Sequence, residues 1–589
     1  MGPMKARLLR TATFIALSLT FVALYLVNRS AFAGTYYIAA NGSDSNSGTS
    51  ETAPWLHAPG MPNCTGSCAS HTPAAGDSII FRGGDTWHFG NSAAAPYTGG
   101  SWNLTNSAGN SSTCVYEGTQ TGCIYYGVDK TWFSGSSWVR PILNGDNPLS
   151  TTTVSACSYQ IGSGNQMVIQ GAGSGYYNIL DNFEMTGLCT QRSTGGDGNV
   201  DVYVEDGGSG VSAQGMLFEE NLYIHGWTAT TTAGTGNNAV ACNVIGGGNQ
   251  SLHTIISVVI DGSDSDPQVC AWGIFPSFYH FKDSMIRYTT QGVGQYCHDI
   301  HDNIFEHFYT PNVPTHGNIL ECNDDANGSA PGQPSGSPNV FYNNIVRHDS
   351  PGFGAAGQVH VWFCPETVPE YWFNNLMYDV ANENYWDVAG PPTYSCSNTG
   401  GQFMFNNTLV DGNQPCNLGP NSTGGKYLTV YNEQLINTPF DSSGSGCTGG
   451  PASATNLAMT ASTAITQGYL IGSGGTTNSD TCANDTTPCA PGASTNGTVG
   501  AGANHAAYCT SLASYTSEPA IGTDAAKACQ YGTTDGCSYN SSTHTMSCPS
   551  QTAVARPTSA AWDSGAYQFS GSQATNAPQP VTSLKVTVQ

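Results

Sequence analysis

The fold of this chain is decided by a short phrase, Phe341-Tyr342-Asn343-Asn344-Ile345-Val346, that recurs along the sequence. The phrase consists of two apolar or aromatic residues, a pair of small polar residues, and two more apolar residues. Close copies are Trp372-Phe373-Asn374-Asn375-Leu376-Met377 and Met404-Phe405-Asn406-Asn407-Thr408-Leu409, and looser copies occupy residues 179–184, 218–223, 281–286 and 300–305. Seven copies of one phrase indicate a repeat architecture.

The spacing between copies varies, which indicates coils of constant width joined by loops of variable length. Ser284 and Asn303 are 19 residues apart, whereas Asn375 and Asn407 are 32 apart. A single coil cannot bury its apolar face, but stacked coils share one core. Equivalent residues then lie above one another at the strand spacing of ~4.8 Å. An Asn at a fixed corner can hydrogen-bond to the backbone and to the next Asn.

The composition agrees with many short strands and turns. The chain has 589 residues, of which only 9% are charged and 72 are Gly. Short apolar runs end at Gly near residues 78–83, 138–145 and 166–171. Strands of four to six residues with frequent turn signals predict an all-β chain.

Three further stretches resemble one known family. The opening runs from Tyr36-Tyr37-Ile38 to Pro54-Trp55, and Gly76-Asp77-Ser78-Ile79-Ile80-Phe81-Arg82-Gly83-Gly84 looks like a first coil. Arg556-Pro557 with Trp562-Asp563-Ser564-Gly565-Ala566-Tyr567 is similar to a closing coil. Together with the Asn phrase they resemble the pectate-lyase-like superfamily of exported bacterial proteins. The resemblance implies a right-handed parallel β-helix and says little about chemistry.

The chain divides into four predicted parts. Residues 1–33 read as a signal peptide, with basic residues, an apolar run and Ala31-Phe32-Ala33 as a cleavage site. An uncleaved membrane anchor is the alternative. Residues 34–440 are the β-helix with its N-terminal cap, 441–570 are Cys-, Gly- and Ser-rich coils or an appendage, and 571–589 are a flexible tail.

All 20 cysteines follow the leader, and an even number in an exported chain favours disulfides. Pairs close in sequence are Cys64 and Cys68, Cys114 and Cys123, Cys482 and Cys489, and Cys537 and Cys548. The net charge of −25 argues against nucleic acid as a partner. An acidic polysaccharide would also be repelled unless cations or a local basic patch intervene.

Aligning the seven copies on their ladder Asn produces columns of equivalent residues. Two residues before it stand Leu180, Glu219, Lys282, His301, Tyr342, Phe373 and Phe405. Three residues after it stand Met185, Ile224, Arg287, Glu306, Arg347, Tyr378 and Val410. Ionisable residues therefore gather in the middle coils, where members of the superfamily place their substrate groove.

We predict a catalytic site formed by Lys282, Arg287, His301, Glu306 and Arg347. Cleavage by β-elimination needs a group that neutralises a uronate carboxylate, a base, and an acid for the leaving oxygen. Lys282 can serve as the base if Arg287 lowers its pKa, and His301 can transfer protons near neutral pH. Alternatively, Arg287, Glu306 and Arg347 form a salt-bridge ladder on the outer wall, each bridge contributing about 0–1 kcal/mol.

Two other chemistries are open. Hydrolysis requires two carboxylates flanking the bond; Asp324-Asp325 is an adjacent pair with Glu306 nearby, although its surroundings favour a loop. The stretch Asp261-Gly262-Ser263-Asp264-Ser265-Asp266 offers three carboxylates at turn spacing, so Asp261, Asp264 and Asp266 are candidate Ca²⁺ ligands. The stretch lacks the full EF-hand pattern.

These observations predict a secreted or cell-surface monomer that binds and cleaves a polysaccharide by lyase or hydrolase chemistry. Beyond Ca²⁺ we expect no cofactor, and after leader cleavage no membrane contact. The alternative is a non-catalytic spacer or adhesin of the cell surface or matrix.

Overall fold

The computed structural model describes most of the coils and leaves gaps between them. The described residues are 34–104, 113–114, 120–161, 168–172, 177–190, 201–207, 216–230, 242–247, 252–266, 270–275, 277–308, 318–322, 336–349, 358–362, 368–380, 384–388, 401–411, 417–418, 428–438, 455–470 and 490–570. The predicted leader, residues 1–33, and the predicted tail, residues 571–589, lie outside them.

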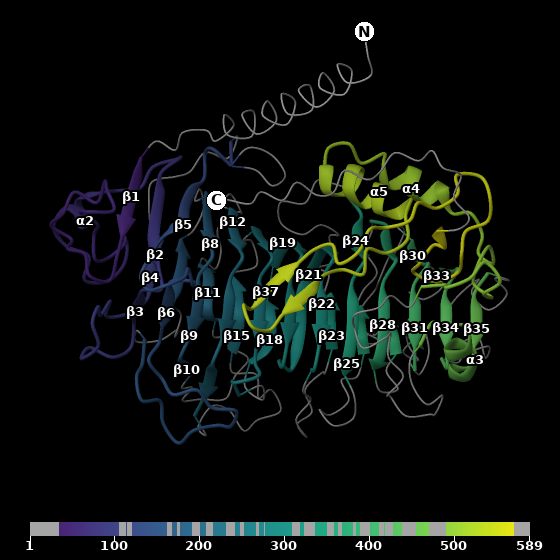
Figure 1. Cartoon of the computed structure of the whole chain (residues 1–589), viewed down its shortest axis with the longest axis horizontal. Coiled ribbons are helices and arrows are strands. Elements are labelled where there is room, and N and C mark those ends of the chain that lie inside the picture. The colour runs from purple at the N-terminus through teal and green to yellow at the C-terminus, as the bar shows by residue number, and fades with distance from the viewer. Residues whose placement is uncertain are drawn as a thin grey trace, which may run out of the picture.

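Three parallel sheets run along the length of the molecule (Figure 1). Sheet A contains β1 (Thr35–Ile38), β2 (Ser78–Gly83), β5 (Ile124–Phe133), β8 (Tyr177–Asp181), β12 (Met216–Glu220), β16 (Leu252–Ile256), β19 (Ser277–Lys282), β21 (Gln291–His301), β24 (Asn339–Tyr342), β27 (Glu370–Phe373), β30 (Gln402–Phe405) and β33 (Leu428–Tyr431). Sheet B contains β3 (Thr86–His88), β6 (Ile142–Asn144), β9 (Glu184–Thr186), β13 (Tyr223–His225), β17 (Val259–Asp261), β20 (Met285–Arg287), β22 (Ile304–Glu306), β25 (Ile345–Asp349), β28 (Leu376–Val380), β31 (Thr408–Val410), β34 (Gln434–Ile436) and β35 (Leu457–Met459).

Sheet C closes each coil. It contains β4 (Trp102–Asn103), β7 (Ile169–Ala172), β11 (Asp201–Gly207), β15 (Cys242–Gly247), β18 (Cys270–Phe275), the first part of β21, β23 (Asn318–Cys322), β26 (Gln358–Trp362), β29 (Asn384–Val388) and β32 (Asn417–Leu418). The chain passes from sheet C to sheet A to sheet B and returns, and β21 is long enough to belong to both C and A. The predicted right-handed parallel β-helix is confirmed, with the hand that parallel crossovers favour. Its coils continue to β35, past the predicted boundary at residue 440.

The core is built from columns of apolar residues that point inward. On sheet A the alternation of strand side chains places Leu180, Ile255, Phe281, Ile300, Phe341, Trp372, Met404 and Val430 in one inward column, and all are buried. Sheet B contributes Ile260, Ile286, Phe305, Val346 and Met377. Each coil thus covers the apolar residues of the next, as stacking requires.

The two polar residues of the phrase have different tasks at the corner between sheets A and B. The first adopts the left-handed conformation, with φ of 55° at Asn343 and 61° at Asn374, which Asn tolerates better than most residues. The second points into the coil and forms a ladder. Asn303 donates to Asn344, Asn344 to Asn375, and Asn375 to Asn407, at 2.9–3.1 Å.

The structure corrects the sequence alignment of the first two copies by one residue. Asn182 and Asn221 are left-handed corner residues, with φ of 61° and 55°, and Phe183 and Leu222 occupy the ladder position. Aligning Asn182 and Asn221 with the ladder Asn of the later copies therefore displaced the first two copies by one residue. In a strand, a displacement of one residue exchanges the side chains that point inward with those that point outward. The residues on the outer column with Lys282 are Asp181 and Glu220, not Leu180 and Glu219.

Residues 490–570, called here the C-terminal segment, fold back along the helix. The helices α4 (Ala506–Leu512), η3 (Ala520–Ala525) and α5 (Ala526–Cys529) cover sheet A near β24, β30 and β33 (Figure 1). The antiparallel hairpin of β36 (Ser538–Asn540) and β37 (Thr545–Ser547) packs on the middle coils. Arg556 and Trp562, expected in a closing coil, belong to this segment.

The C-terminal segment follows the corner between sheets A and B, because the left-handed residues there have free side-chain amides and carboxylates to bind it. The contacts, from the C-terminal coils toward the N-terminal ones, are Asn432 Nδ2 to Ala503 O (2.8 Å), Asn406 Nδ2 to Asp563 O (2.8 Å), Asn374 Nδ2 to Tyr531 O (3.0 Å), Thr534 Oγ1 to Asp302 Oδ1 (2.5 Å) and Arg140 to His544 O (3.1 Å).

Remaining elements are small. The described residues also contain α2 (Gly66–Ser70), α3 (Ala461–Thr466) and a two-stranded sheet of β10 (Leu188–Thr190) and β14 (Trp227–Ala229). Among the described residues, none of the helices has the length and apolar character that a bilayer span requires.

Disulfides close several of the turns and loops. Three predicted pairs, Cys64–Cys68, Cys114–Cys123 and Cys537–Cys548, are present. The structure adds Cys157–Cys189 and Cys509–Cys529, whose partners lie too far apart in sequence to be paired by eye. The predicted pair of Cys482 and Cys489 lies outside the described residues.

Candidate functional site on the outer face of sheet A

The five residues predicted to form one catalytic site lie on two different faces. Lys282 and His301 are neighbours in register on sheet A. Arg287, Glu306 and Arg347 are neighbours in register on sheet B. The corner between the sheets separates the groups, so the structure does not bring Arg287 to Lys282 as the base hypothesis required.

The sheet B residues form a continuous ladder of charges. Arg287 Nε lies 3.2 Å from one oxygen of Glu306, and Arg347 Nε lies 2.7 Å from the other. Asp261 and Tyr378 extend the ladder at its two ends, 3.9 Å from Arg287 and 3.4 Å from Arg347. Burial alone would raise the pKa of Glu306, but the two guanidiniums hold it below its usual range. This arrangement matches the salt-bridge ladder that the sequence left open.

The three candidate metal ligands are engaged separately. Asp261 Oδ1 accepts a hydrogen bond from Ser263 N at 2.9 Å, and Asp264 lies 2.8 Å from His225 Nδ1. Asp266 is buried beside Trp227. Of the described residues, only Asp283, Cys537 and Cys548 bring three potential ligand atoms together, and both cysteines belong to a disulfide. The described geometry therefore does not gather Asp261, Asp264 and Asp266 around an ion.

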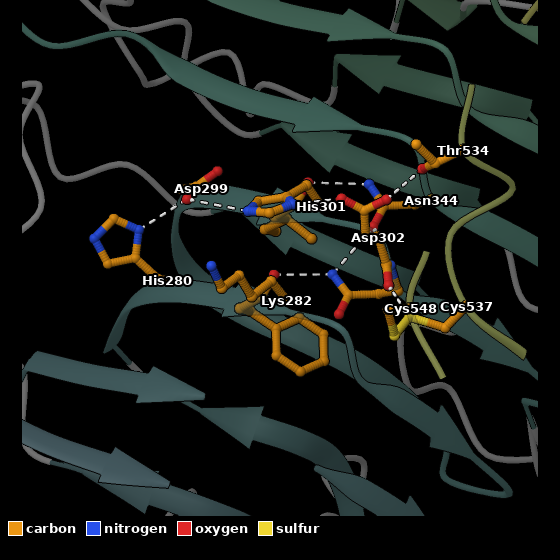
Figure 2. A network of polar contacts seen from close by, with 12 residues as sticks. His280, Lys282, Asp299, His301, Asp302, Asn344, Thr534, Cys537 and Cys548 are labelled. Atoms are coloured by element: carbon orange, nitrogen blue, oxygen red, sulfur yellow. Dashed lines mark hydrogen bonds and ion pairs between the residues drawn. A yellow bond between two sulfur atoms is a disulfide. The ribbon is translucent and has the colours of Figure 1, made fainter. Parts of the chain in front are cut away.

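The outer face of sheet A carries a polar cluster around Lys282 and His301 (Figure 2). The carboxylate of Asp299 lies 2.8 Å from His280 Nδ1 and 3.7 Å from His301 Nε2. The other ring nitrogen of His301 lies 2.7 Å from Asp302. In Figure 2 the Lys282 side chain extends toward the end of the network formed by His280 and Asp299.

The two histidines of this cluster differ in charge. Burial would lower the pKa of His301, but Asp299 and Asp302 raise it to about 9, so His301 is an imidazolium near neutral pH. Burial lowers the pKa of His280 despite its bond to Asp299, so His280 is neutral. The positive charge of Lys282 opposes that of His301. The cluster therefore presents cationic groups next to one buried carboxylate.

Glu220 is the member of this face that the sequence alignment missed. It lies in the same outer column as Lys282, with Ile256 between them. Burial and the charge of Asp181 raise the pKa of Glu220 to about 7, against smaller opposite effects of Gln120 and Lys282. The alternation of strand residues in β12 (Met216–Glu220) was the available signal, once the corner residue is taken as Asn221.

The carboxylates beside Glu220 are held by hydrogen bonds. Asp181 accepts from Tyr125 Oη at 2.6 Å and from the side-chain amides of Asn182 and Asn221 at 2.7 and 2.8 Å. Glu220 accepts from Gln120 Nε2 at 3.3 Å and remains half-buried. Its raised pKa and partial exposure distinguish it as the group that can give up a proton near neutral pH.

The C-terminal segment closes one end of this face. His298 Nε2 lies 2.5 Å from Glu518 of the segment, and Glu518 also bonds to Ser337. Beyond His301 the outer column continues as stacked rings, with centroids 4.6 Å apart for His301 and Tyr342 and 5.0 Å for Tyr342 and Phe373. The helices of the segment cover these rings. The accessible part of the column therefore lies between β5 and β21.

The pair Asp324-Asp325 lies outside the described residues.

Comparisons with known proteins find only distant similarity. No protein-family model matches the sequence, and no curated protein matches it at a significant level. A lacto-N-biosidase of family GH136 from Eubacterium ramulus is 10% identical over 71% of this chain and 70% of its own, with a TM-score of 0.34. The pectate lyase Pel9A is 14% identical over 80% and 92%, with a TM-score of 0.37. At these values the likeness assigns neither substrate nor activity; the parallel ladders of the chain itself establish its fold.

Proposed function

We propose that this chain is an exported enzyme that cleaves a uronate-containing polysaccharide by β-elimination on the outer face of sheet A. The observation that carries the proposal is the column of Glu220 and Lys282, in which a half-buried carboxyl group with a pKa of about 7 faces a cationic side chain two strands away. At ~4.8 Å per strand, the two positions leave room for a sugar ring above Ile256.

The roles follow from protonation. Glu220 is partly protonated at neutral pH and can donate a proton to the leaving glycosidic oxygen. Lys282, in its neutral amine form, takes the proton next to the uronate carboxylate. His301 in turn offers positive charge to the uronate. The C–H bond next to the uronate carboxylate and the C–O bond on the adjacent carbon break, and a C=C bond forms between these two carbons. The proton goes to Lys282, the leaving oxygen takes the proton of Glu220, and the uronate that lost its proton becomes unsaturated.

Elimination is favoured over hydrolysis by the state of the other carboxylates. Hydrolysis requires two carboxyl groups that act on the bond or on water. Asp181, Asp299 and Asp302 are all tied by hydrogen bonds or ion pairs to neighbouring side chains. Glu220 is half-buried and has a pKa of about 7, so it is the carboxyl group of this column that is suited to act as an acid.

Two features support the substrate and the compartment. A linear polymer suits a column that repeats along a solenoid, and the His301 imidazolium supplies the local positive charge that an acidic chain needs on a protein of net charge −25. The five described disulfides favour an oxidising compartment, in keeping with the leader expected at residues 1–33.

The test measures unsaturated products and new reducing ends on polygalacturonate, alginate and glycosaminoglycans. Glu220→Gln and Lys282→Met should each lower kcat at least about 100-fold, the usual contribution of a general acid or base. Lys527→Met removes a lysine of α5, which packs near Asn374 several coils away from Glu220 and Lys282, and serves as the control. Reducing ends without unsaturated product would replace elimination by hydrolysis. No cleavage of any substrate would favour the spacer or adhesin alternative.

A further inference from the structure

Two tryptophans lie at the opposite end of sheet A from the helices of the C-terminal segment. Trp132, in β5, meets Tyr37 edge-on at 5.3 Å and has the Arg82 guanidinium 6.0 Å from its centre. Trp138 packs against Gly83, where an added Cβ would come within 2.9 Å of the indole. Both indoles thus lie against the end of β2 and are only half-buried.

A cation accompanies these rings. Lys130 Nζ lies 4.9 Å from the centre of the Trp138 ring, and the Lys130 residue is exposed. Within the described part of the chain Lys130 forms no ion pair. Val139, next to Trp138, is 52% exposed. Two half-buried indoles beside an exposed lysine form a patch that combines apolar ring surface with a positive charge, in a chain with only 15 basic residues.

This patch is continuous with the candidate site. The strand β5, which carries Lys130 and Trp132, pairs with β8, and Asp181 at the end of β8 is in register with Glu220. The C-terminal hairpin reaches toward the patch and ends at Arg140, which binds the carbonyl groups of Thr543 and His544. The patch therefore begins where the covering segment stops.

We propose that Trp132, Trp138 and Lys130 form a binding platform for a uronate-containing polysaccharide, located outside the reacting centre. The indole faces stack on sugar rings, and Lys130 pairs with a carboxylate of the same polymer. A charged occupant is favoured because the platform carries a cation on an acidic protein. The choice of substrate rests on the proposed function, whereas the location of the platform does not.

The test measures binding with the full chain carrying Glu220→Gln, so that the polymer stays intact. Polygalacturonate, alginate and hyaluronan serve as acidic probes and a β-1,4-glucan as the neutral one, in affinity electrophoresis at low and high salt. Trp138→Ala should weaken binding of at least one acidic probe about tenfold, and Trp138→Phe much less. Lys130→Met should weaken it about threefold at low salt only and leave the glucan unaffected. Lys527→Met is the matched control.

The outcomes separate the platform from the catalytic proposal. Unchanged binding in both Trp138→Ala and Lys130→Met overturns the platform, as does the absence of binding to any acidic probe by the parent. The platform is supported if Trp138→Ala loses binding and Trp138→Phe keeps most of it, since a folding defect caused by removing the indole would affect both of these variants. If the platform variants lose binding while the chain with native Glu220 cleaves nothing, the platform stands and the elimination proposal fails. If cleavage is lost in Glu220→Gln but binding is unchanged in Trp138→Ala and Lys130→Met, the elimination proposal stands and the platform fails.

Discussion

The Asn ladder contains one acid, Glu433, between Asn407 and Asn456, and this supplies a test of how the ladder works. Glu433 occupies the position after Asn407 and is fully buried. Its Oε1 accepts hydrogen bonds from Asn407 N at 3.2 Å and Nδ2 at 3.1 Å. Its Oε2 has no partner among the described residues. Burial raises the pKa of Glu433 well above its usual range, against a smaller opposing effect of Asn407.

The sign of the pH dependence follows from this shift. A carboxyl group whose pKa is higher in the folded chain than in the unfolded one, about 4.3, binds a proton more tightly when folded. Its favourable contribution is complete below about pH 4.3 and is lost as the pH rises toward the folded pKa. The loss is about 1.4 kcal/mol per pH unit inside that window. A Gln in this position keeps the accepting oxygen and never ionises.

We therefore predict that Glu433→Gln stabilises the chain increasingly as pH rises. At a pH two units above the unfolded pKa and still below the folded pKa, the free energy of unfolding of Glu433→Gln should exceed that of the native chain by roughly 2.7 kcal/mol more than it does at low pH. Urea denaturation followed by tryptophan fluorescence from pH 5 to pH 8 measures this difference. Glu51→Gln, on an exposed residue, is the control. A difference between Glu433→Gln and the native chain that stays constant over this range would refute the argument.

Three further changes test other contacts. Asn344→Ala removes a ladder member that links Asn303 to Asn375 and should lower the free energy of unfolding in urea by about 1–3 kcal/mol. Asn343→Gly, at a left-handed corner, should lower it by under about 1 kcal/mol. Glu518→Gln should loosen the C-terminal segment and speed its proteolysis. In the native chain that protection should fade as pH falls through the lowered pKa of Glu518 or rises through the raised pKa of His298. Arg347→Met should lower stability by about 1–3 kcal/mol, since it leaves Glu306 with one cation, while cleavage by folded protein stays at the native rate.

The repeat was readable from the sequence because identical residues stack on identical residues. Phe341, Trp372 and Met404 lie in one inward column as their common place in the phrase predicts. The outer face of sheet A was harder to predict from the sequence. Its residues are assigned by counting from the corner, and a single Asn there can be either the left-handed corner residue or the ladder residue that follows it. In the first copies Phe183 and Leu222 fill the ladder position, and apolar packing there replaces hydrogen bonding. Only the strand pairing reveals that Asp181 and Glu220, rather than their neighbours, share a face with Lys282.

The C-terminal segment could not be read from the sequence for a different physical reason. Its contacts join residues far apart in the chain, such as Arg140 with His544 and His298 with Glu518. These contacts have no local periodicity. The carbonyl groups that accept from Asn374 and Asn406 belong to irregular backbone, so their positions follow from the finished helix and not from any motif.

The division of the helix into an open half and a covered half follows from the same corner. Where the ladder consists of Asn residues, from Asn303 to Asn407, the outer column of sheet A carries the stacked rings of Tyr342, Phe373 and Phe405, and the C-terminal helices cover them. Where Phe183 and Leu222 replace the ladder, the outer column carries Asp181 and Glu220, and the next two coils add Ile256 and Lys282. Covering those charges would cost desolvation without a hydrogen-bonded partner. The segment accordingly covers apolar rings and leaves Glu220 and Lys282 half-buried, which is the condition a substrate needs to reach them.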